Sequence, residues 1–104
     1  MLFRSARVAR FVEAPVAERY LDKYYEPSGD LAIPVLTIHT TRDPVVPIFH
    51  EGLYAQRAAA RGASAKLVQR SIDRYGHCEF AIGELTDAFR TLAGWVSTGQ
   101  RPTQ

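Results

Sequence analysis

Two short segments with the length of strands constrain the fold of this chain more than any other feature. Residues 33–39 are apolar and rich in β-branched side chains, and residues 66–72 predict a second strand. A helical pattern separates them, running from about Pro47 to Arg61 and followed by Gly62, which is typical of a helix end. A strand–helix–strand order predicts a parallel pair, and parallel strands need both faces covered. We therefore expect an α/β fold in which this pair has further neighbours.

Two more helical patterns flank the predicted pair. Residues 14–25 and residues 84–97 both repeat apolar side chains at helical spacing. In the second pattern the stripe consists of Leu85, Phe89, Leu92 and Val96. The predicted order is therefore helix, strand, helix, strand, helix. We divide the chain into a basic leader or the edge of a longer chain (1–13), a partial α/β domain (14–99) and a flexible tail (100–104).

Charge and cysteine content exclude several classes of protein. Thirteen basic and eleven acidic residues give a net charge of +2, too little to indicate a nucleic-acid partner. No apolar run approaches the roughly 18 residues that cross a bilayer, so we expect no membrane span. The single cysteine, Cys78, excludes an internal disulfide. The first residues carry Arg4, Arg7 and Arg10 but lack the apolar stretch of a secretory signal, so the compartment stays open.

Polar loops follow both predicted strands, at the edge where open α/β sheets build their sites. Asp43 lies in the first loop and His77 in the second. If the strands are neighbours, the two side chains can meet. A carboxylate bonded to one ring nitrogen fixes the tautomer of an imidazole and leaves the other nitrogen as a general base. The plainer alternatives are a turn-forming aspartate before Pro44 and a surface histidine beside Gly76.

Other chemistry in these loops has less support. Cys78 adjoins His77, but neighbouring side chains in an extended loop point to opposite sides, so we expect a small, buried or half-buried thiol. His39 and His50 match no ligand spacing with His77 and Asp43, so we predict no metal and no cofactor. Several aromatic residues have the spacing of core or pocket packing rather than of a platform for stacked bases. They are Tyr20, Tyr24, Tyr25, Phe49 and Tyr54.

The stretches around Asp43 and His77 resemble the α/β-hydrolase fold. IPVLTIHTTRDPVVP is similar to the strand and acid loop of that fold, and VQRSIDRYGHCEF is similar to its last strand and histidine loop. The closing helix is similar to the C-terminal helix of bacterial serine hydrolases and esterases. The resemblance implies that residues 14–99 are the C-terminal portion of such a domain, with Asp43 as the triad acid and His77 as the triad base. It further implies that Val45 and Ile48 line the substrate pocket.

The family's nucleophile is missing from the chain. No G-x-S-x-G turn occurs, and the serines lie outside any such context. They are Ser5, Ser28, Ser64, Ser71 and Ser97. We therefore expect hydrolysis of carboxylic esters, or less favourably of small peptides or amides, only when an N-terminal segment or a complementing chain supplies the serine and the oxyanion hole. The alternative is a non-catalytic module that dimerises or docks through an exposed sheet edge.

Overall fold

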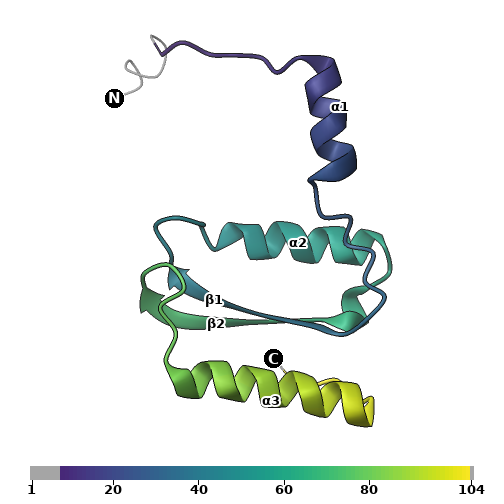
Figure 1. Cartoon of the computed structure of the whole chain (residues 1–104), viewed down its shortest axis with the longest axis vertical. Helices are drawn as coiled ribbons and strands as arrows, with labels where there is room; N and C mark the ends of the chain where they lie inside the picture. The colour runs from purple at the N-terminus through teal and green to yellow at the C-terminus, as the bar shows by residue number, and fades with distance from the viewer. Residues whose placement is uncertain (1–7, 104) are drawn as a thin grey trace.

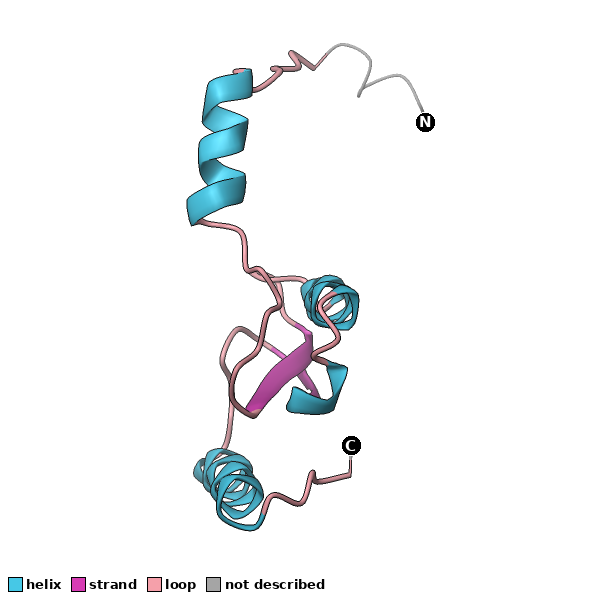
Figure 2. Cartoon of the chain, turned by 90° about the vertical axis from the view of Figure 1, so that its right-hand side faces the viewer, coloured by secondary structure: helices cyan, strands magenta, loops and turns pink. Residues whose placement is uncertain are grey.

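The computed structural model describes residues 8–103, and its elements follow the predicted order. They are α1 (Pro15–Tyr24), β1 (Val35–Arg42), α2 (Phe49–Ala60), the 3₁₀ helix η2 (Ser64–Lys66), β2 (Leu67–Tyr75) and α3 (Ile82–Thr98). β1 and β2 form a two-stranded parallel sheet. The helices α2 and α3 lie on opposite sides of this sheet, and α1 stands apart from it (Figure 1). The view along the strands shows the same layers (Figure 2). The mixed α/β arrangement confirms the predicted class.

Both strands extend further toward the candidate site than the sequence predicts. β1 begins after Pro34 and continues through Arg42, and β2 continues to Tyr75. The extra residues, 40–42 and 73–75, are polar or half-polar, so the apolar pattern ends before the strands do. Threonine has a high strand propensity because its branched side chain suits a pleated, half-buried surface. Most side chains of β1 are only half-buried, so the strands are less enclosed than predicted.

The pairing of the strands contains one irregularity. Partners run in step from Val35 with Leu67 to Thr40 with Ile72, and the next pair is Arg42 with Tyr75. Over this interval β1 advances by two residues and β2 by three, so β2 carries one extra residue, a β-bulge. Both strands then end side by side at one edge of the sheet (Figure 1).

The core is small and lies mainly between the sheet and α2. Ala58, Ala63 and Leu67 form its buried cluster. Val68, the next residue of β2, is fully buried on the opposite face of the sheet, since strand side chains alternate between faces. Tyr54 packs against this cluster as predicted. On the other face, α3 buries Ala88 and Trp95. The apolar stripe predicted for this helix is instead largely exposed, at Leu85, Phe89 and Val96.

The aromatic residues of α1 do not join this core. α1 contains no buried residue, and the tyrosines at its end contact each other: the ring of Tyr20 lies 4.9 Å from that of Tyr24 and 5.8 Å from that of Tyr25, the residue after the helix. Phe49 is exposed as well and stacks on His50. The prediction of core or pocket packing is therefore wrong for these four aromatic residues. An ion pair between Glu26 and Arg57 links the end of this region to α2.

The two ends of the chain depart in part from the predicted division. Residues 1–7 of the predicted leader lie outside the described residues, and residues 8–13 form no helix or strand. In the predicted tail, the guanidinium of Arg101 donates a hydrogen bond of 2.7 Å to the backbone oxygen of Leu67, which holds this segment against β2.

Among the described helices, none is long and apolar enough to cross a membrane.

Candidate active site

Asp43 and His77 lie within hydrogen-bond distance of each other. Nδ1 of His77 is 2.8 Å from Oδ2 of Asp43. Asp43 follows the end of β1, and His77 comes two residues after the end of β2. Because β1 and β2 are parallel neighbours, their carboxyl ends bring the two loops together, as the sequence predicts. The Asp43 side chain is only 4% exposed, whereas the His77 side chain is 44% exposed.

The second carboxylate oxygen of Asp43 holds its own loop. Oδ1 accepts hydrogen bonds from the backbone N–H groups of Val45, at 2.8 Å, and Val46, at 2.9 Å. This is the turn-forming role that was the plainer alternative for Asp43. The two interpretations are therefore compatible, since one oxygen organises the turn and the other contacts the imidazole.

These bonds keep Asp43 ionised. Desolvation of the carboxyl raises its pKa, but hydrogen bonds from Val46, His77 and Val45 outweigh that effect and lower the pKa from 3.8 to about 2. An ionised carboxylate can only accept hydrogen bonds, so Nδ1 of His77 must donate. In the neutral imidazole Nε2 is then the acceptor, which is the tautomer that a general base requires.

A buried hydroxyl fixes the start of the histidine loop. Thr40 of β1 is fully buried, and its Oγ1 donates a hydrogen bond of 2.6 Å to the backbone oxygen of Gly76. The N–H of Gly76 in turn donates to the backbone oxygen of Arg42, at 3.3 Å. Gly76 has a φ of +121°, which disfavours any residue with a Cβ. Together these contacts join the residue before His77 to β1, the strand that Asp43 directly follows.

An ion pair braces the far end of the same loop. The guanidinium of Arg74 donates two hydrogen bonds to the Glu84 carboxylate, at 2.7 and 2.9 Å, and another to the backbone oxygen of Glu79, at 2.7 Å. The Glu84 carboxylate also accepts the N–H of Ala81 at the start of α3, at 2.8 Å. The hydrogen bonds from Arg74 and then Ala81 lower the pKa of Glu84. Sequence analysis missed Arg74 and Thr40, because their partners become known only once the two strands are paired and the loop after β2 is in place.

A cavity of about 220 Å³ lies against the pair. The Asp43 and His77 side chains contribute to its wall, and Cys78 does so as well. Its remaining lining is mostly apolar, with Ile38, Val46 and Phe80 prominent. Ligand sites typically combine apolar walls with a few polar groups, and this cavity is below the usual size for drug-sized ligands. It therefore suits a small group.

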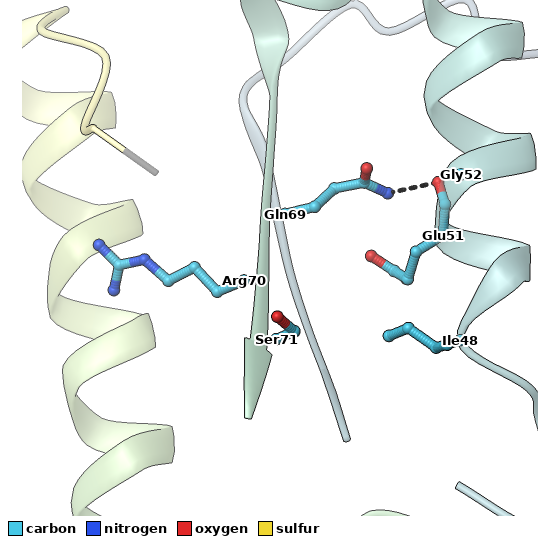
Figure 3. A pocket seen from close by; sticks show the side chains of 6 residues that line it. All are labelled: Ile48, Glu51, Gly52, Gln69, Arg70 and Ser71. Carbon is cyan, nitrogen blue, oxygen red and sulfur yellow. Dashed lines mark hydrogen bonds between the residues drawn. The ribbon is translucent and has the colours of Figure 1, made fainter. Parts of the chain in front are cut away.

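The residues predicted to line a substrate pocket lie elsewhere. Val45 is exposed and is not part of the wall of this cavity, where its neighbour Val46 takes the place. Ile48 lines a different hollow of about 250 Å³, between α2 and β2. In that hollow the side chain of Gln69 points to α2 and donates to the backbone oxygen of Glu51, whereas Arg70 points to the opposite side (Figure 3). Ile48 directly precedes α2 and borders the hollow beside β2, whereas Val46 borders the cavity at Asp43.

Cys78 differs most from its prediction. The thiol is exposed, not buried, and its Sγ lies 3.6 Å from Nε2 of His77. The loop is not extended at this point, because Cys78 has a φ of +54°. Positive φ values are uncommon for residues other than glycine, and cysteine is not among the usual exceptions, so no sequence signal indicated this turn. The expectation that the two side chains point apart is wrong.

Other candidate groups take no part in the pair. Nδ1 of His39 donates to the backbone oxygen of Thr40, within β1 rather than at its end, and His50 is exposed in α2. Within residues 8–103, no group of three or more potential ligands forms a metal site. The described serines have other positions: Ser28 accepts the N–H of Asp30, and Ser97 donates to a backbone oxygen of α3.

Comparison with known proteins adds no relative: no protein-family model, no curated protein and no solved structure matches the chain.

Proposed function

We propose that this chain carries the acid–base half of a serine-hydrolase active site and acts on carboxylic esters. The observation that carries the proposal is the 2.8 Å contact between Oδ2 of Asp43 and Nδ1 of His77 at the carboxyl edge of a parallel sheet. The resemblance of both loops to the α/β-hydrolase fold supports the same assignment. In this proposal residues 14–99 are the C-terminal portion of that fold.

The proposed mechanism gives each residue one task. Nε2 of His77 takes the proton from a serine hydroxyl as that oxygen attacks the ester carbonyl, and it later returns the proton to the leaving alkoxide. Asp43 stays ionised and stabilises the imidazolium through Nδ1, consistent with its lowered pKa. Water then hydrolyses the acyl-enzyme with His77 again as the base. The apolar cavity beside the pair accommodates a small part of the ester.

The serine and the oxyanion donors come from outside these residues in this proposal. None of the described serines hydrogen-bonds His77, and the acid and base lose most of their catalytic effect without a nucleophile. Without that serine, the chain alone gives no saturable hydrolysis of unactivated alkyl esters above that of the His77→Ala variant. Saturable turnover of an alkyl ester that disappears in His77→Ala would overturn this expectation.

Fluorophosphonate labelling tests the proposal, because such probes modify only serines activated by a base and an oxyanion hole. The tagged chain is expressed in its native cells and isolated with any polypeptide that completes it. We expect an adduct on a serine outside this chain, lost in His77→Ala and retained in the matched control His50→Ala, whose imidazole is exposed on α2. Equal labelling in both variants, or no labelled serine, would refute the assignment.

A second candidate function is a non-catalytic interaction module. The sheet has two strands in the described part of the chain, so each strand leaves one edge without a partner strand. Open edges and the exposed apolar side chains of α3, such as Phe89, favour self-association or docking. Sedimentation velocity from 5 to 200 μM distinguishes the two proposals: reversible dimerisation unaffected by His77→Ala favours the module, and a monomer throughout counts against it.

A further inference from the structure

We propose that Cys78 is itself a nucleophile, a thiol that gives its proton to His77 and accepts short acyl groups from activated esters or thioesters. The proposal uses the imidazole of the proposed function but needs no serine from another segment. It rests on the side chains of Asp43, His77 and Cys78 and on the cavity that they border.

The three groups form a continuous relay. The Asp43 carboxylate contacts Nδ1 of His77 at 2.8 Å, and Nε2 of the same ring lies 3.6 Å from Sγ of Cys78. Since Nδ1 donates to the ionised carboxylate, Nε2 is the acceptor and faces the thiol. A distance of 3.6 Å is within hydrogen-bond reach for the large sulfur atom. This is the general arrangement of an activated nucleophile: a thiol, a base, and a third group that orients the base.

The backbone of the loop holds the thiol in this place. With an ordinary extended conformation at Cys78, its side chain would point away from that of His77. The φ of +54° turns the chain instead, and the N–H of Phe80 closes the turn by donating to the backbone oxygen of Cys78 at 2.9 Å. Before His77 the loop is joined to β1 by the bond from Thr40, and after Cys78 it is joined to Arg74 of β2, which also pairs with Glu84 of α3. These contacts hold the thiol beside Nε2 of His77.

The cavity indicates the substrate class. Cys78 and His77 share its wall with Ile38, Val46 and Phe80, and its volume is about 220 Å³. The apolar lining favours an aliphatic acyl group over a charged one, and the volume favours a short chain. Because the thiol is exposed, the leaving group of the substrate can depart directly into solvent. Small activated acyl compounds fit these constraints.

The proposed reaction has two balanced steps. First, the thiol proton moves to Nε2 of His77, the sulfur electron pair forms a bond to the acyl carbon, and the bond to the leaving oxygen or sulfur breaks; the leaving group takes the proton from Nε2. Second, water gives a proton to Nε2 and attacks the thioester carbon, the carbon–sulfur bond breaks, and the thiol recovers its proton from the imidazolium. No oxidant or reductant is required. Asp43 stabilises the imidazolium in both steps.

The experiment follows acetylation of Cys78 by p-nitrophenyl acetate at pH 7, using p-nitrophenol release and peptide mass mapping. We expect one acetyl group on Cys78, formed at least about tenfold faster in the parent chain than in His77→Ala, since a positioned general base contributes about 10²–10⁴-fold. The control His50→Ala should react like the parent. Equal Cys78 rates in the parent and His77→Ala would overturn the proposal.

A second measurement does not depend on whether a variant folds. In 8 M urea the relay is lost, so the rate at Cys78 of the parent chain should fall to that of a short peptide with the same loop sequence. A rate unchanged by urea would mean an ordinary exposed thiol and would also overturn the proposal. Because this readout is on Cys78 and the fluorophosphonate readout is on a serine, failure here is distinguishable from failure of the proposed function.

Discussion

Substitution of Gly76 by alanine tests how the histidine loop is held. Gly76 has a φ of +121°, and a methyl group at this position would lie 2.4 Å from Cγ and 3.1 Å from Cβ of Glu79. The strained backbone costs about 1–3 kcal/mol. The overpacking against Glu79 adds roughly 1–3 kcal/mol, because Cγ and Cβ lie close to the backbone and cannot move far. We expect Gly76→Ala to lower the free energy of unfolding by about 2–6 kcal/mol.

Urea unfolding followed by far-UV circular dichroism measures this loss. With a slope of roughly 1 kcal/mol per molar for a small domain, the midpoint falls by about 2 M or more, or the transition disappears. The matched control is Gly62→Ala, where φ is +68° but nothing lies within 4 Å of the added methyl group. That variant carries only the backbone cost, about 1–2 kcal/mol.

The double variant Gly76→Ala/Glu79→Ala separates the two contributions. Removing Cγ and Cδ of Glu79 relieves the closest contact, whereas the hydrogen bond from Arg74 to the backbone oxygen of residue 79 stays. Relative to Glu79→Ala alone, we expect Gly76→Ala to cost only the backbone part, about 1–3 kcal/mol. If Gly76→Ala is no more destabilising than Gly62→Ala in the wild-type background, the reasoning about this loop is refuted.

Three further predictions concern the acid and the core. Asp43 has a lowered pKa of about 2 in the folded chain, so its stabilising effect is complete above about pH 5 and is lost as the pH falls toward 2. The difference in urea midpoint between the parent and Asp43→Asn should therefore shrink as the pH falls over that range. A difference that increases on acidification would contradict this. Thr40→Val leaves a buried backbone oxygen without its donor and should cost about 1–3 kcal/mol in urea unfolding. The control Thr41→Val loses an exposed bond and should change stability by less than about 0.5 kcal/mol. Val68→Ala, at a fully buried position, should lower the thermal midpoint by the equivalent of about 2–3 kcal/mol, whereas the exposed Val96→Ala should leave it almost unchanged.

Much of the fold follows from local rules that the sequence carries. Gly62 ends α2 because its φ of +68° is a conformation that other residues rarely adopt. The meeting of Asp43 with His77 follows from parallel pairing, which brings the carboxyl ends of neighbouring strands together. Both inferences need only short stretches of sequence and one topological rule.

The features that sequence analysis missed depend on contacts between distant segments. The stripe with Leu85 and Phe89 predicts the buried face of α3, but a sheet of two strands is too narrow to cover it, so the smaller Ala88 and the Trp95 ring pack there instead. The turn at Cys78 has no sequence signal, because its φ of +54° is set by the loop's attachment at both ends. A pattern of apolar residues therefore predicts the helix, but not which of its faces meets the sheet.

The bulge in β2 makes the position of the imidazole depend on a count of residues. β2 uses three residues where β1 uses two, between the pairs Thr40–Ile72 and Arg42–Tyr75. Deletion of a single residue in this interval would move Gly76 and the loop after it back by one place along β1, away from the bonds with Thr40 and Arg42. Insertions and deletions are tolerated best in loops, but here the number of residues in β2 itself determines where the loop with His77 begins. Length variation in β2 would therefore abolish the Asp43–His77 pair while leaving every residue of the pair in the sequence.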